Sequence, residues 1–104
     1  MRHGPADTMR AFDNGGHVKV VVSAIDDALW AWDPAGLADV RKDIPNEYAD
    51  LASSCASSIL NGSTVDAALA RVEEMLRRDW GIDRVPSADF RTQLVAIAER
   101  ASRP

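Results

Sequence analysis

The chain has 104 residues, of which 46% are hydrophobic and 27% charged, and its formal net charge at pH 7 is −4. This length is typical of one domain, and the composition is that of a globular protein rather than of a disordered chain. No apolar run approaches the roughly 20 residues that a membrane-spanning helix needs. An acidic protein is a poor partner for nucleic acid, because neutralising phosphates requires a basic face. We therefore expect one folded domain that binds neither membrane nor nucleic acid directly.

Residues 1–16 are predicted to form a flexible N-terminal arm ahead of a single domain over 17–104. The arm carries Arg2, His3 and Asp7 near its start and has no apolar core of the kind found in a signal peptide. The chain has one cysteine, Cys55, so it cannot form an internal disulfide framework or a four-thiolate zinc site. These features favour a cytoplasmic protein.

An apolar stripe predicts the first helix, which we expect to begin after Gly15-Gly16. The stripe consists of Val18, Val21, Val22, Ile25, Ala28, Leu29 and Trp32. The β-branched run Val20-Val21-Val22 is also compatible with a strand. The helical spacing continues without a break to Trp32, however, so the helix is favoured. Pro34 is expected to end this helix, and Gly36 to permit the turn that follows.

Three further helices are expected after a linker over residues 37–44. The second begins near Pro45 and ends at Asn61-Gly62. The third is capped by Ser63 or Thr64 and ends at Gly81, and the fourth is capped by Ser87. Short loops between consecutive helices favour antiparallel neighbours. The predicted fold is therefore all-α, a compact bundle of about four helices.

The sequence contains no pattern typical of a catalytic or metal site. His3 and His17 belong to no metal-ligand spacing. The adjacent carboxylates Asp26 and Asp27 diverge by about 100° on a helix, so they are unsuited to paired acid–base work. Cys55 falls on the apolar stripe of the second helix, where a thiol is a small hydrophobic group and a poor nucleophile. We expect no enzyme activity, no metal and no cofactor.

Negative charge gathers between residues 26 and 50, where seven acidic residues face two basic ones. Trp30 lies within the same stretch, about 200° around the helix from the core residue Trp32. Two interpretations of Trp30 stay open, namely packing under the linker and a partly exposed binding surface. The candidate partner-binding residues are Asp26, Asp27, Trp30, Asp33, Asp39, Asp43, Glu47 and Asp50.

A short motif resembles the YugE-like family, a group of small bacterial helical proteins of unknown function. The motif comprises Leu29-Trp30-Ala31-Trp32-Asp33-Pro34-Ala35-Gly36-Leu37, then Pro45-Asn46-Glu47-Tyr48, and later Trp80-Gly81. The positions that match are Trp32, Asp33, Pro34, Gly36, Glu47 and Tyr48. The stretch from Asp43 to Asn46 departs from the family's more acidic lead-in. Similar sequences occur among bacterial immunity proteins that neutralise polymorphic or contact-dependent toxins, so the resemblance implies a binding role.

Two hypotheses follow. In the first, the chain is an immunity protein that binds a cognate protein toxin such as a nuclease, whose basic groove would complement the acidic stretch. In the second, it is a structural or regulatory interaction module that forms a homodimer. The sequence also leaves open whether the interface is the 26–50 surface or the Arg/Glu-rich face of the third helix.

Overall fold

A computed structural model describes the backbone of residues 5–101 and the side chains of residues 17–101. Its helices are α1 (Pro5–Trp32), the short 3₁₀ helix η1 (Ala38–Val40), α2 (Ala49–Leu60), α3 (Val65–Trp80) and α4 (Ala88–Ala101). The described residues contain no strand. The prediction of an all-α bundle of about four helices is confirmed.

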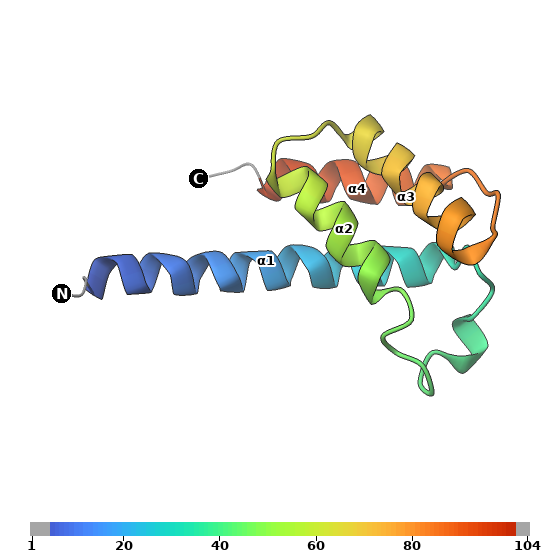
Figure 1. Cartoon of the computed structure of the whole chain (residues 1–104), viewed down its shortest axis with the longest axis horizontal. Helices are drawn as coiled ribbons and strands as arrows, with labels where there is room; N and C mark the ends of the chain where they lie inside the picture. Colours follow the sequence, from blue (N-terminus) through green and yellow to red (C-terminus); the bar gives the residue numbers. More distant parts are fainter. Residues whose placement is uncertain (1–4, 102–104) are drawn as a thin grey trace.

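The long helix α1 forms the base on which α2 and α4 pack, and α3 packs on those two helices (Figure 1). Helix α1 contacts α2 and α4, and α2 in turn contacts α3. The N-terminal part of α1 extends past the ends of α2 and α4, and the whole molecule measures 50 × 31 × 22 Å (Figure 1). The connection between α1 and α2, which carries η1, projects from the opposite end of the bundle (Figure 1).

Two helix starts differ from the prediction. The first helix begins at Pro5 and runs through Gly15-Gly16, because a glycine inside a helix costs only about 1 kcal/mol relative to alanine and does not forbid it. Proline suits the first helical position, where no amide donor is required. Residues 1–4 and all side chains before His17 lie outside the described residues, so the N-terminal arm stays a prediction.

The second helix begins at Ala49 rather than near Pro45. The preceding residues form tight turns instead, in which Glu47 N–H donates to the Ile44 carbonyl at 3.1 Å and Ala49 N–H donates to the Asn46 carbonyl at 3.1 Å. Tyr48 stands at the N-cap with φ −93° and ψ 7°, outside the helical range.

The predicted caps of the last two helices are confirmed. The Thr64 hydroxyl accepts a hydrogen bond from Ala67 N–H at 3.1 Å, and the Ser87 hydroxyl accepts one from Phe90 N–H at 3.0 Å. Gly81 ends α3 with φ 67°, a left-handed conformation that favours glycine. These caps satisfy backbone donors and acceptors that each helix end would otherwise leave free.

The core brings together one face of each helix. Its largest fully buried side chains are Tyr48, Phe90, Ile25, Leu29, Leu51, Leu76, Leu94, Val72 and Cys55. Of the two interpretations of Trp30, packing under the linker is the one that the structure supports, whereas Trp32 differs from its expectation. Trp30 is buried, with 4% of its surface exposed, whereas Trp32 is half-buried and stacks on Phe90 with 5.2 Å between ring centroids. The expectation of Trp32 as a core residue is therefore wrong in degree. Trp30 is a packing residue beneath the connection.

Candidate protein-binding surface

Asp33 organises the turn that ends α1. Its φ of 53° is left-handed, a conformation that aspartate tolerates better than most residues. The Asp33 carboxylate accepts hydrogen bonds from Leu37 N–H at 2.7 Å and Ala38 N–H at 2.9 Å. It also accepts one from the Tyr48 hydroxyl at 2.8 Å. These three bonds tie the carboxylate to the fold, so Asp33 is not available to a partner.

Tyr48 links this turn to the rest of the core. Its side chain has no exposed surface, and its hydroxyl also accepts a hydrogen bond from Ala35 N–H at 2.9 Å. The Tyr48 ring lies between Trp30 at 4.6 Å and Trp80 at 5.6 Å, measured between centroids. Trp80, the last residue of α3, therefore belongs to the same aromatic cluster. The motif residues from three parts of the sequence thus meet in one packed unit.

The packing of Asp33 and Tyr48 determines how readily each of them ionises. Burial by itself would raise the pKa of Asp33, but the hydrogen bonds from Leu37, Tyr48 and Ala38 outweigh it and hold that pKa below its ordinary value. For Tyr48, burial raises the pKa well above its ordinary value. The pair is therefore a carboxylate that accepts and a neutral phenol that donates across the physiological pH range.

Arg84, in the loop between α3 and α4, also binds the turn that ends α1. Its Nη1 donates a hydrogen bond to the Pro34 carbonyl at 2.9 Å, across 50 positions of sequence. With this bond, the α3–α4 loop and the α1–α2 connection are held together. We define the Asp33 turn as residues 33–37 with the side chains that hold them.

The residues that follow the Asp33 turn are held quite differently. Residues 38–43, which we call the η1 segment, are all exposed. Beside the bond from Ala38 N–H to Asp33, the segment contacts the body through Arg41, whose Nη2 donates to Asp27 Oδ1 at 3.0 Å. The Arg41 guanidinium also lies over the Trp30 ring, 5.2 Å from the centroid. One arginine thus joins this segment to the side of α1.

Two polar atoms on the same side of α1 are buried without a hydrogen-bond partner, namely Asp26 Oδ1 and Trp30 Nε1. The two residues are four positions apart, so they lie on one helix face. Burial raises the pKa of Asp26, the charge of Arg41 opposes that rise, and the charge of Asp27 adds to it. Asp26 is therefore less readily ionised than an ordinary carboxylate.

The remaining candidates lie in the open. Asp39, Asp43, Glu47 and Asp50 are exposed. Within the described part of the chain, no hydrogen bond or ion pair occupies their carboxylates. We call these four residues the acidic surface. They follow one another along the connection from η1 to the first turn of α2. The eight predicted residues thus divide into four free carboxylates and four residues engaged in or buried against the fold.

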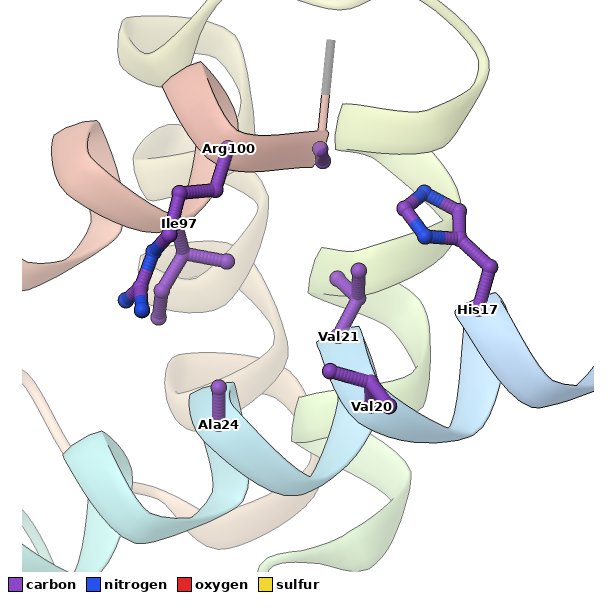
Figure 2. A pocket seen from close by; sticks show the side chains of 7 residues that line it. His17, Val20, Val21, Ala24, Ile97 and Arg100 are labelled. Carbon is purple, nitrogen blue, oxygen red and sulfur yellow. The ribbon is translucent and has the colours of Figure 1, made fainter. Parts of the chain in front are cut away.

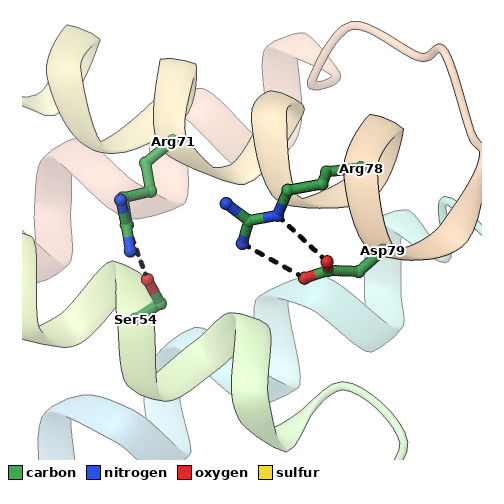
Figure 3. A network of polar contacts seen from close by, with 4 residues as sticks. All are labelled: Ser54, Arg71, Arg78 and Asp79. Carbon is green, nitrogen blue, oxygen red and sulfur yellow. Dashed lines mark hydrogen bonds and ion pairs between the residues drawn. The ribbon is translucent and has the colours of Figure 1, made fainter.

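Two other surfaces of the protein are candidates for binding a partner. A hollow of about 210 Å³ opens between α1 and α4, where Val20, Val21 and Ala24 face Ile97 (Figure 2). Val20 is 67% exposed there. On the face of α3, Arg71 Nε donates to Ser54 Oγ of α2 at 2.9 Å, and Arg78 pairs with its neighbour Asp79 (Figure 3). This α3 face is the alternative interface that the sequence left open.

Nothing in the described residues suggests metal chemistry or a transmembrane segment. Over residues with defined side chains, no group of three or more histidine, cysteine, aspartate or glutamate side chains could hold a metal ion. Among the helices as described, none combines the length and apolarity required to cross a bilayer. Burial raises the pKa of the Cys55 thiol to about 12, which suppresses the reactive thiolate.

Sequence reasoning missed the arginines of this site. Arg41 was visible as one of two positive charges within an acidic stretch, and that isolation was the available signal. Arg84 gave no such signal, because its partner is a backbone carbonyl far away in the sequence. Tyr48 was identified in the motif, but its hydrogen bond to Asp33 depends on how the connection folds back.

Comparison with known protein families, with curated proteins and with solved structures finds no match for this chain. The resemblance to the YugE-like family and the link to immunity proteins therefore stay predictions.

Proposed function

We propose that this chain is a non-catalytic immunity protein of the cytoplasm, which binds a cognate bacterial toxin through the acidic surface and blocks it. The observation that carries the proposal is a set of four exposed carboxylates, none of them paired among the described residues, on a connection whose base is fixed by the Asp33 turn.

The charge of the acidic surface suits a toxin with a basic groove, as in a nuclease. Carboxylates facing such a groove compete with the phosphates of the substrate and accelerate encounter, an effect that falls with added salt. The proposal requires no chemistry from the chain itself, in line with the buried thiol and the engaged Asp33 carboxylate.

The first test is co-expression with the product of the neighbouring gene. We expect that product to be toxic alone, to be tolerated in the presence of this chain, and to co-purify with it. A neighbour that is harmless, or a toxic neighbour that this chain neither binds nor neutralises, would sink the proposal.

A matched pair of triple variants locates the interface. The first is Asp39→Asn with Asp43→Asn and Glu47→Gln, and the second is Asp83→Asn with Asp89→Asn and Glu74→Gln. Both remove three exposed negative charges, two aspartates and one glutamate. We expect the first to slow association with the toxin by about tenfold or more at low salt and the second to have little effect. Equal effects would show that net charge alone matters, and the reverse order would place the interface elsewhere.

The runner-up is an interaction module that forms a homodimer. The hollow between α1 and α4 favours it, because Val20 leaves apolar surface exposed in the hollow that Ile97 also lines (Figure 2). Light scattering separates the two proposals. A stable dimer in the absence of any toxin favours the module, and a monomer that becomes a one-to-one complex favours the immunity protein.

A further inference from the structure

Arg41 is held by two groups that together suit a guanidinium. The Asp27 carboxylate accepts a hydrogen bond from its Nη2 at 3.0 Å, and the Trp30 ring lies beneath its Cζ at 5.2 Å from the centroid. An arginine gains from both arrangements, since its planar cation stacks on aromatic faces and its N–H groups match a carboxylate. The contacts of Arg41 therefore indicate that Asp27 and Trp30 together accept a guanidinium group.

The two sides of this contact differ in rigidity. Asp27 and Trp30 belong to α1, and Trp30 is fixed further by its contact with the buried Tyr48 at 4.6 Å. Arg41 belongs to the η1 segment, in which no residue is buried. The Arg41 side chain is 47% exposed and that of Asp27 is 70% exposed. Asp27 and Trp30 are thus built into the bundle, while Arg41 is partly exposed and is held by a weak contact.

With Arg41 in place, the site still has hydrogen-bond donors and acceptors that are not used. A guanidinium has five N–H donors, yet one hydrogen bond from Arg41 to the described residues is present. Next to it, Asp26 Oδ1 is buried and has no partner. Arg41 is near enough for its charge to lower the pKa of Asp26. A guanidinium that is free to reorient has this second carboxylate as a further acceptor.

We infer that Asp27 and Trp30, with Asp26 beside them, form a recognition site for an arginine side chain of a protein partner. In the free protein Arg41 occupies this site, and on binding the partner's arginine takes its place. The inference deepens the proposed function and depends on it for the identity of the partner, a toxin with a basic surface. Displacement of Arg41 also releases the η1 segment, so that Asp39 is free to follow the partner's surface.

The test uses Arg41→Ala and a small probe in place of the toxin. The probe is N-acetyl-arginine methylamide, and its matched control is N-acetyl-citrulline methylamide, which has a similar shape but no charge. The measurement is the NMR shift of the indole N–H of Trp30, assigned with Trp30→Phe, at constant ionic strength. We expect saturable binding of the arginine probe to Arg41→Ala, with a Kd on the order of 10 mM given an exposed ion pair and a cation–π contact. Wild type should bind more weakly, by up to about fivefold, because the exposed Arg41 contact competes within the molecule.

Further variants keep the result decisive. Adding Asp27→Asn to Arg41→Ala should abolish the shift, whereas adding Asp89→Asn on α4 should leave it unchanged. If Arg41→Ala loses its near-UV circular dichroism, Arg41→Gln retains part of the side-chain stem and is titrated in the same way. A shift that is absent in the folded variant, that is equal in wild type, or that the citrulline probe reproduces would overturn the inference. Toxin binding without arginine binding would refute this site alone, and arginine binding without a toxin partner would refute the proposed function alone.

Discussion

The connection between α1 and α2 contains two neighbouring regions that use acidic residues in opposite ways. In the Asp33 turn, one carboxylate accepts three hydrogen bonds and lies against a fully buried tyrosine. In the η1 segment and the turns after it, the carboxylates of the acidic surface are exposed and have no partner in the described chain. The first arrangement stabilises the fold, whereas the second leaves charge available to another molecule. Substitutions should therefore affect stability in the first region and association in the second.

The largest effect is expected from Tyr48→Ala. This change removes a buried ring between Trp30 and Trp80 and leaves a cavity, which should lower the free energy of unfolding by about 4 kcal/mol. Urea denaturation followed by circular dichroism measures it. Tyr48→Phe is the matched control, because it keeps the ring and removes only the hydroxyl. The Ala35 N–H then loses its acceptor and Asp33 Oδ1 loses one donor, which should cost about 1–2 kcal/mol. A loss below 1 kcal/mol for the alanine variant would contradict the role of Tyr48.

The next effect is expected from Asp33→Asn. Asparagine tolerates the left-handed backbone, so the loss reports on the charged acceptor and should be about 2 kcal/mol at neutral pH. The folded-state pKa of Asp33 is lowered, so its contribution is present above its ordinary pKa of about 3.9 and disappears as the pH falls through the folded-state value. The difference between wild type and variant should therefore vanish in acid. Asp39→Asn, which neutralises an exposed carboxylate of the η1 segment, is the matched control for the change in net charge.

The helices and most of their ends were predictable because local rules decide them. The apolar stripes give the core faces, and Thr64, Gly81 and Ser87 act as the caps that their chemistry indicates. The starts of α1 and α2 were not predicted correctly. At the first, Gly15-Gly16 suggests that the helix begins after these residues, but two glycines carry only a small cost and the helix runs through them. At the second, the burial of Tyr48 competes with helix formation from Pro45, which a local pattern does not reveal.

The sequence predicts the negative charge of the site, but it does not predict every contact that the acidic residues make in the folded chain. The count of acidic residues over 26–50 located the connection, and the motif singled out Asp33 and Tyr48. The bonds that Asp33 accepts from Leu37 and Ala38 are local, but the bond from Tyr48 joins residues 15 positions apart and is not revealed by a local pattern. The positions of Trp30 and Trp32 depend likewise on which neighbour covers them, since helical periodicity fixes the angle between them but not the packing partner.

A smaller effect is expected from Arg41→Ala. The ion pair with Asp27 is exposed, so its loss should cost no more than about 1 kcal/mol of unfolding free energy. The environment of Trp30 should change far more, because the guanidinium covers its ring. In a background with Trp32→Phe and Trp80→Phe, tryptophan fluorescence should shift to longer wavelength as the ring gains contact with water. An unchanged spectrum would show that the η1 segment is held by contacts other than Arg41.

The smallest effect, and one of opposite sign, is expected from Asp26→Asn. Burial raises the folded-state pKa of Asp26, so its ionised form at neutral pH is disfavoured in the folded protein. A carboxyl group with a raised pKa contributes its stability below the ordinary value and loses it as the pH rises through the folded-state value. Asparagine does not ionise, so the variant should be slightly more stable than wild type at pH 7, and this advantage should disappear in acid.

The neighbouring Asp27→Asn is the control, because it removes the acceptor of Arg41 and should be neutral or slightly destabilising at pH 7. Urea midpoints at the two pH values decide between them, and a loss of stability for Asp26→Asn at pH 7 would mean that its pairing with Arg41 outweighs its burial.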